Sequence, residues 1–217
     1  MVAITGRKAL PDARRVVVKV GSALLVDEDK NTINTAWLAG IAIDIAQLKA
    51  AGKDVVVVSS GAIALGSRLL KIHNKTMSLQ EKQAAAATGQ VSLAHAWMDA
   101  LGAHKVQTAQ ILLSPDDTET RRKHLNARAT MGALLELGAV PVVNENDTVA
   151  TAEIRFGDND RLAARVAAMI GADLLVLLSD VDGLYTGNPN DNKAATHLPQ
   201  IDHITADIMA MAGAANA

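Results

Sequence analysis

Two short clusters that mix amide and carboxylate side chains are the sharpest chemical signals in the sequence. Residues 144–147 read NEND and residues 157–160 read GDND. Such clusters suit the two charged ends of an amino acid, and their acids could also position a cation. Turn and helix-cap chemistry is the alternative, since Asp158 or Asn159 could cap a helix that starts near Asp160.

A lysine interrupts a run of valines in residues 15–20, which read RVVVKV. Burying Lys19 without a partner is costly, so its ammonium group either reaches solvent or is held by the strand against an anion such as a phosphate. Gly21 and Ser22 follow directly, and backbone N–H groups at such a turn can contact an anion.

Ser60 and Gly61 follow a second valine-rich run and open a helix. Ser60 could simply cap that helix. Alternatively, the glycine lets a carboxylate or phosphate approach the free N–H groups at the helix N-terminus. The chain has neither a Walker A motif nor a GxGxxG after a strand, so the common nucleotide fingerprints do not apply. The six histidines form no ligand constellation, and we predict no metal-ligating residue.

Strand and helix patterns alternate along the chain. Strand patterns occupy residues 15–20, 54–58, 106–113, 140–144 and 173–178, and helical patterns occupy residues 35–51, 75–102, 121–137, 160–170 and 205–213. This order predicts an α/β fold, a three-layer α/β/α sandwich with a mainly parallel central sheet. Ligands of such sheets bind beyond the carboxyl ends of the strands. The segments predicted there are residues 19–22, 59–62, 144–147 and 179–182, and they include Lys19, Ser60, Asn144, Asp147, Ser179 and Asp180.

Composition narrows the functional classes. A chain of 217 residues with net charge −2 predicts one domain without the electrostatic footprint of a nucleic-acid-binding protein. No apolar run approaches the roughly 18 residues of a membrane span, and no secretory signal precedes the first strand. The absence of cysteine is compatible with a reducing compartment, so we expect a cytoplasmic location without nucleic-acid or membrane partners.

Together these segments resemble the amino acid kinase family, and within it the glutamate 5-kinase branch. The resemblance covers residues 16–213. It rests on VVVKVGS ending at Ser22, VVVSSGAIALG ending at Gly66, HLNAR at residues 124–128, VPVVNENDTVATAEIRFGDND at residues 140–160 and LLSDVDGLYTGNP ending at Pro189. The stretch from Asn144 to Asp160 is specific to the glutamate 5-kinase branch.

The resemblance implies a role for each candidate. It makes Lys19 the lysine that contacts the transferred phosphoryl group and Asp160 an acid needed for catalysis, with Asp158 assisting. The residues that it assigns to glutamate are Ser60, Asp147 and Asn159, with Asn144 beside them. Besides Lys19, the residues that it assigns to the nucleotide are Ser179, Asp180 and Tyr185.

The resemblance also implies a reaction. ATP with Mg²⁺ would phosphorylate the side-chain carboxylate of L-glutamate, and a glutamyl phosphate reductase would consume the product in proline biosynthesis. Proline would act as a feedback inhibitor of a homo-oligomer. Family members carry a second lysine in a later glycine-rich segment, and many bacterial members have a C-terminal RNA-binding-like domain. Residues 1–217 contain neither, which predicts a single kinase domain that is incomplete at its C-terminus. A kinase for another carboxylate or a carbamate, or a non-catalytic binding fragment, remain the alternatives.

Overall fold

The computed structural model of the chain describes residues 10–27, 32–72, 76–149, 159–189 and 192–211. Contacts divide the chain into two compact units. One comprises residues 13–180, and the other comprises residues 1–12 with residues 181–217. The larger unit contains the sheet and almost all of the candidate residues.

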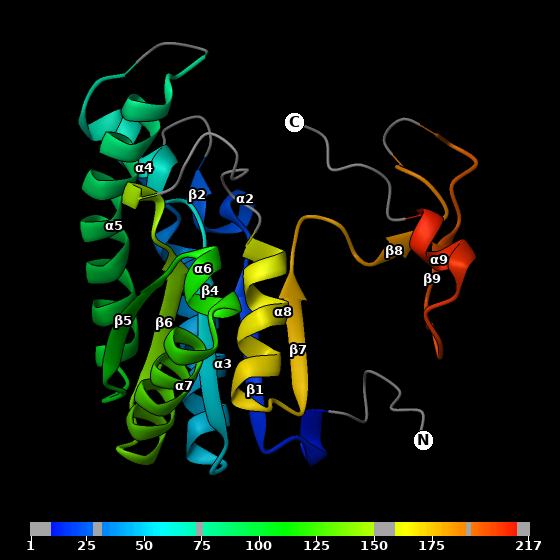
Figure 1. Cartoon of the computed structure of the whole chain (residues 1–217), viewed down its shortest axis with the longest axis horizontal. Coiled ribbons are helices and arrows are strands. Elements are labelled where there is room, and N and C mark those ends of the chain that lie inside the picture. The colour runs from blue at the N-terminus through cyan, green and yellow to red at the C-terminus, as the bar shows by residue number, and fades with distance from the viewer. Residues whose placement is uncertain (1–9, 28–31, 73–75, 150–158, 190–191, 212–217) are drawn as a thin grey trace. The chain divides into compact units, whose positions relative to one another are not determined.

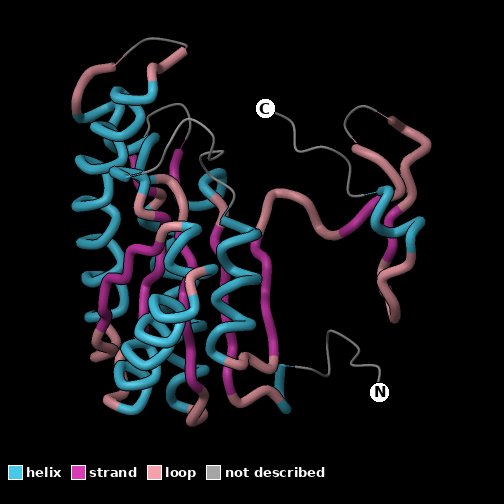
Figure 2. The backbone as a smooth tube through the Cα atoms, in the orientation of Figure 1, coloured by secondary structure: helices cyan, strands magenta, loops and turns pink. Residues whose placement is uncertain are grey.

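A five-stranded sheet forms the centre of the larger unit (Figures 1 and 2). Its strands are β1 (Arg15–Val20), β4 (Asp54–Ser59), β5 (Thr108–Leu113), β6 (Val140–Glu145) and β7 (Leu174–Leu178). They pair in the order β5-β6-β4-β1-β7, and every pairing is parallel. In this register Lys19 lies opposite Val58 on one side and Leu177 on the other.

Helices cover both faces of the sheet, as alternation along the strands requires. Val16, Val18 and Val20 pack in one core with α3 (Thr35–Ala50), α4 (Ala62–Leu69) and α5 (Leu79–Gly102). Val17, Val56 and Val58 pack in a second core with α7 (Arg121–Glu136) and α8 (Asn159–Ile170). The predicted α/β fold with a parallel sheet between helices is therefore confirmed (Figure 1).

Two predicted boundaries were wrong by two residues or more, for local reasons. The long helix begins at Leu79 instead of residue 75, because Ser78 and Glu81 form a reciprocal capping box. Strand β5 begins at Thr108 instead of residue 106. The N–H of Val106 donates to the carbonyl of Leu101 at 3.1 Å, which closes the end of α5 and keeps Val106 out of the sheet.

Several short elements were not predicted, because each is too short to show a hydrophobic period. In the larger unit they are α2 (Ser22–Leu25), β2 (Val26–Asp27), β3 (Thr32–Ile33), α6 (Pro115–Glu119) and the 3₁₀ turn η1 (Asp147–Val149).

The smaller unit contains an antiparallel pair, β8 (Leu184–Tyr185) with β9 (His197–Leu198), and the helix α9 (Ala206–Met211). The rings of Tyr185 and His197 lie 5.2 Å apart between centroids. The helix predicted over residues 205–213 is thus observed as α9, and its last two residues lie outside the described part of the chain. Within the ranges that the structure describes, no helix has the length and apolar character to cross a membrane.

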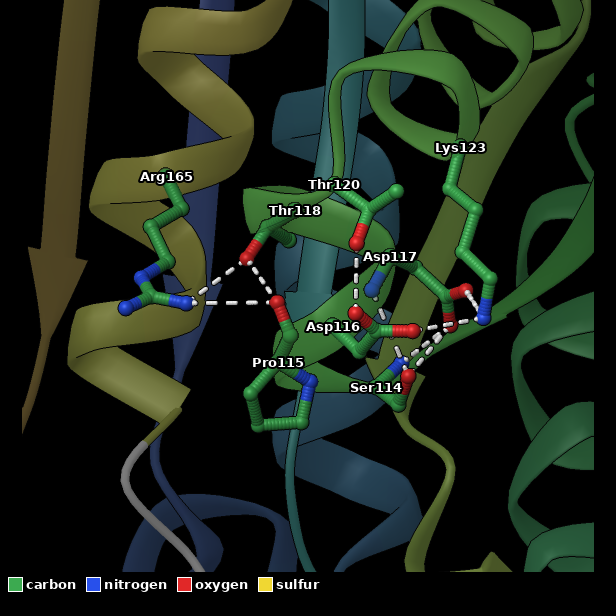
Figure 3. A network of polar contacts seen from close by, with 8 residues as sticks. All are labelled: Ser114, Pro115, Asp116, Asp117, Thr118, Thr120, Lys123 and Arg165. Carbon is green, nitrogen blue, oxygen red and sulfur yellow. Dashed lines mark hydrogen bonds and ion pairs between the residues drawn. The ribbon is translucent and has the colours of Figure 1, made fainter.

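A polar network ties helix α8 to the segment that follows β5 (Figure 3). Arg165 of α8 donates to Thr118 Oγ1 at 2.7 Å and pairs with Glu119 of α6. On the other side of α6, Lys123 of α7 pairs with Asp116 at 2.8 Å. The hydrogen bond from Lys123 holds the pKa of the Asp116 carboxyl below its ordinary value. These contacts fix α8, whose first two residues are candidate site residues.

Candidate active site

A pocket of about 550 Å³ opens at the carboxyl ends of four parallel strands. The strands are β1, β4, β6 and β7, so the pocket lies where ligands of open α/β sheets bind. Its lining includes seven of the residues selected from the sequence, namely Lys19, Ser60, Asn144, Asp147, Asn159, Ser179 and Asp180. These residues come from segments far apart in the sequence, and the fold gathers them at one site.

The lysine in the valine strand has a partner at the pocket. Lys19 Nζ lies 2.7 Å from Asp160 Oδ1, and the two side chains are 12% and 61% exposed. The half-buried ammonium group therefore faces a carboxylate that water still reaches. Next to it, the N–H of Gly21 donates to the Leu178 carbonyl at 3.2 Å and joins the ends of β1 and β7. The lysine is fixed at the pocket rim, and Asp160 compensates its charge.

Asn159 is the centre of a buried amide network. Its Nδ2 lies 2.9 Å from the Ser59 carbonyl, 2.7 Å from Ser60 Oγ and 3.0 Å from Asn144 Oδ1. Asn159 is 3% exposed, although it is the first residue of α8. The side chain thus connects the ends of β4 and β6 across the pocket floor.

The interpretation of Ser60 as an N-cap was wrong. Gly61 is the N-cap of α4, at φ +101° in the left-handed region, and no side chain caps the helix. Ser60 instead accepts a hydrogen bond from Asn159 at 2.7 Å. The N–H groups of the first turn of α4 have no intrahelical acceptor, and Gly61, Ala62 and Ile63 line the pocket. This helix N-terminus can therefore receive an anionic group from the pocket.

Two residues of α5 that sequence reasoning missed complete the network. Asn144 Nδ2 donates to Gln90 Oε1 at 2.7 Å, and Trp97 Nε1 donates to Ser59 Oγ at 2.9 Å. Gln90 and Trp97 lie seven residues, about two helical turns, apart on one face of α5. The only sequence feature that could have indicated these two residues is a glutamine on the otherwise apolar buried face of an Ala-rich helix.

One buried acceptor of the network has no partner. Within the described part of the chain, Asn159 Oδ1 is buried and makes no hydrogen bond. An unpaired buried polar atom costs about 1–3 kcal/mol, so native proteins seldom keep one without a purpose. Asn159 lines the pocket, and its Oδ1 is shielded from water in the ligand-free protein, so this oxygen is a candidate acceptor for a ligand N–H or O–H group once a ligand reaches it.

Asp147 adds a second acceptor group. Its carboxyl is buried and lines the same pocket. Burial, aided by the negative charge of Glu145, raises the pKa of Asp147 to about 7. Near neutral pH the group is therefore close to half protonated without a ligand. A ligand cation beside it would favour the ionised form.

We expect Asp147→Asn to stabilise the ligand-free protein in a pH-dependent way. Between about pH 4 and pH 7 the unfolded chain ionises at this position while the native chain keeps its proton, so the stability of the wild type falls as pH rises. Asparagine lacks this penalty. The variant should match the wild type near pH 4 and unfold about 5 °C or more above it at pH 8, by thermal unfolding followed with circular dichroism. A midpoint difference that does not change with pH would contradict the raised pKa.

The remaining candidate residues, Ser179, Asp180, Tyr185 and Asp158, do not all lie at the pocket. Ser179 and Asp180 line the pocket beyond β7, and Ser179 Oγ donates to Asp180 Oδ1 at 3.0 Å. Tyr185 belongs to the smaller unit, where its hydroxyl donates to Asp182 Oδ1 at 2.8 Å, and its nucleotide role stays a prediction. Asp158 lies outside the described residues. The described ranges contain no group of three or more His, Asp or Glu side chains that could hold a metal ion.

Comparison with known proteins finds similarity over nearly the whole chain. The model of the amino acid kinase family matches residues 14–216. A glutamate 5-kinase of Caulobacter vibrioides is 60% identical over 209 residues, which are 96% of this chain and 55% of the relative. A glutamate 5-kinase of Bradyrhizobium diazoefficiens is 59% identical over 204 residues, which are 94% of this chain and 55% of the relative. The chain thus spans about half the length of these curated relatives.

A solved structure supports the fold independently. UMP kinase from Bacillus anthracis superposes with a TM-score of 0.56 at 18% sequence identity, over 85% of this chain and 72% of that one. At this identity the likeness concerns the fold alone. The family model nevertheless covers nearly the whole sequence, and it includes every residue of the pocket. The chain therefore belongs to the amino acid kinase family.

Proposed function

We propose that the protein containing this chain transfers the γ-phosphoryl group of ATP to the side-chain carboxylate of L-glutamate, forming glutamyl 5-phosphate. The observation that carries the proposal is the pair of buried acceptors, Asn159 Oδ1 and the Asp147 carboxyl, in one pocket with the uncapped N-terminus of α4. The two glutamate 5-kinases that are 59% and 60% identical to this chain support the same reaction.

This arrangement complements the charges of an amino acid. The α-ammonium group would donate to Asn159 Oδ1 and neutralise Asp147, which removes both the unpaired acceptor and the penalty for ionising the acid. The α-carboxylate would accept from the free N–H groups at the start of α4, with Ser60 beside them. The side-chain carboxylate would then extend toward the rim of the pocket.

The phosphates would lie at the opposite side of the pocket. Lys19 supplies a fixed cation there, and Ser22 supplies a backbone N–H group just beyond the end of β1. Ser179 and Asp180 line the same side and would contact the nucleotide. Mg²⁺ in kinases is bound through substrate phosphates with one or two carboxylates, so we propose that it arrives with ATP.

The reaction requires the alignment of two anions, the glutamate carboxylate and the γ-phosphate of ATP. It does not require deprotonation of the acceptor. A glutamate carboxylate is already ionised near pH 7, so an oxygen of it can attack the γ-phosphorus directly while the bond to the ADP oxygen breaks. The protein must therefore position the two substrates and offset their repulsion. Lys19 would contact the transferred group, and Asp160 would keep Lys19 oriented through the 2.7 Å ion pair.

Other acceptors fit the pocket less well. A carboxylate without an α-ammonium group would leave Asp147 and Asn159 Oδ1 without a cationic partner. A fragment that binds the substrates without phosphoryl transfer would have the same pocket. The assay described below distinguishes such a fragment from an active kinase. We also propose that a reductase consumes the acyl phosphate product. We further propose that proline inhibits the enzyme by feedback and that the protein is a homo-oligomer.

The test is glutamate-dependent ADP release by the full-length protein, with hydroxylamine present to trap the acyl phosphate. Glutarate, which has both carboxylates and lacks the ammonium group, is the matched substrate. We expect Asn159→Ala to raise the KM for glutamate about 10-fold, since one lost buried hydrogen bond costs about 1–3 kcal/mol, and to leave the KM for ATP nearly unchanged. The variant should also lose discrimination against glutarate.

Two results would contradict the proposal. Absence of glutamate-dependent ADP release from the wild type would exclude the reaction. Equal increases of the KM values for ATP and glutamate in Asn159→Ala would move Asn159 away from the amino acid and toward the nucleotide.

A further inference from the structure

We propose that Gln90 is a positioning residue of the amino acid site, which orients Asn144 and, through it, Asn159. The inference rests on the proposed function. Gln90 is buried in α5 and is absent from the pocket lining, so it would act without contacting the substrate. Its link to the pocket is the 2.7 Å hydrogen bond that its Oε1 accepts from Asn144 Nδ2.

The orientation of the Asn144 amide is determined by two contacts. Its Oδ1 accepts from the backbone N–H of Glu145 at 2.9 Å, and its Nδ2 donates to Gln90. A flipped amide would place its NH₂ group against the Glu145 N–H and leave two donors facing each other. Gln90 completes the pair, because it gives the Asn144 NH₂ group an acceptor in the buried interior.

The orientation of Asn144 in turn fixes Asn159. The Asn159 NH₂ group is surrounded by three acceptors, which are the Ser59 carbonyl, Asn144 Oδ1 and Ser60 Oγ. The Ser59 carbonyl cannot donate, and Asn144 Oδ1 is an acceptor only while Asn144 keeps its orientation. The NH₂ group therefore stays with these atoms, and Oδ1 stays on the other side of the amide, where it is unpaired and would accept from the proposed substrate ammonium group.

Helix α5 thus controls two of the three acceptors around the Asn159 NH₂ group. Gln90 fixes Asn144 Oδ1, and two turns later Trp97 donates to Ser59 Oγ and holds the residue whose carbonyl is the second acceptor. The specificity of the pocket for an ammonium group would therefore depend on a helix that contributes no pocket-lining residue of its own.

The first experiment compares Gln90→Met with Gln80→Met in the full-length protein. Methionine is close to glutamine in length and helix propensity but lacks its amide acceptor. Gln80 lies in the first turn of the same helix, where its side chain is exposed, and it makes none of the network bonds described above. We expect Gln90→Met to raise the KM for glutamate about 10-fold, with the KM for glutarate, the KM for ATP and kcat within about twofold of wild type. Gln80→Met should leave all four values unchanged.

A rescue variant separates the acceptor from packing. Gln90→Glu retains a side-chain oxygen that accepts from Asn144, so it should recover most of the glutamate affinity that Gln90→Met loses. Equal increases in both KM values for Gln90→Met would indicate a merely structural role and overturn the inference. So would a Gln90→Glu protein as impaired as Gln90→Met.

A second measurement does not depend on turnover. In a ¹⁵N-labelled protein without ligand, the side-chain amide protons of Asn144 and Asn159 should exchange with solvent about 10-fold faster in Gln90→Met than in wild type or Gln80→Met. Unchanged exchange at Asn159 would overturn the inference. If the wild type shows this protection but does not phosphorylate glutamate, the proposed function fails while the positioning role of Gln90 stands.

Discussion

Replacement of Lys19 by methionine should lower kcat about 100-fold or more in the full-length protein, with a much smaller change in the KM for glutamate. Lys19 is a strand-held cation at the pocket rim, and its half-buried ammonium group is fixed by Asp160 at 2.7 Å. Loss of one preorganised electrostatic group that acts on a transition state typically costs about 10²–10³ in rate. Steady-state kinetics with ATP and glutamate measure the two parameters separately.

The same strand provides a matched control. Arg15 also forms an ion pair, with Asp54 at 2.9 Å, but it lies at the opposite end of β1 and away from the pocket. Arg15→Met should reduce thermal stability, because it also removes the hydrogen bond to the Ile170 carbonyl, and should leave kcat within about threefold of wild type. If Lys19→Met retains kcat within the same range, Lys19 does not contact the transferred phosphoryl group.

Strand identity and the place of the site could be predicted because both follow from short-range patterns. The valine runs at β1 and β4 are long enough to indicate buried strands, and the helices between them require a parallel sheet. Once strand ends are known, Lys19, Ser60 and Asn144 must lie at one edge of that sheet, and the pocket contains all three. The local sequence therefore determined which residues meet there.

The connections among these residues could not be predicted, because each depends on tertiary contacts between distant segments. Asn159 reaches the Ser59 carbonyl across 100 sequence positions, and Asn144 reaches Gln90 across 54. Nothing near Ser60 in the sequence indicates that its hydroxyl accepts from Asn159 instead of capping α4. The pKa of Asp147 likewise depends on burial, which the motif NEND does not encode.

The position of α5 relative to the pocket depends on two glycines with no evident chemical role. Gly66 of α4 and Gly89 of α5 lie where the two helices meet backbone to backbone. A Cβ at Gly66 would lie 1.7 Å from the Ala85 carbonyl oxygen, and a Cβ at Gly89 would lie 1.8 Å from that of Ala62. Only glycine permits this approach. It holds α4, whose first turn lines the pocket, directly against the helix that carries Gln90.

We therefore expect Gly66→Ala and Gly89→Ala each to destabilise the protein by about 3 kcal/mol or more, since the clash is with rigid backbone and the helices must separate. Gly40→Ala is the control, because Gly40 lies inside α3 with no atom within 4 Å of an added Cβ. There the gain in helix propensity should raise stability by up to about 1 kcal/mol. Urea unfolding followed by circular dichroism gives the three free energies. If the two contact-site variants were as stable as Gly40→Ala, the close packing of α4 on α5 would be wrong. The inferred route from α5 to Asn159 would then lose its structural basis, since Gln90 follows Gly89 directly.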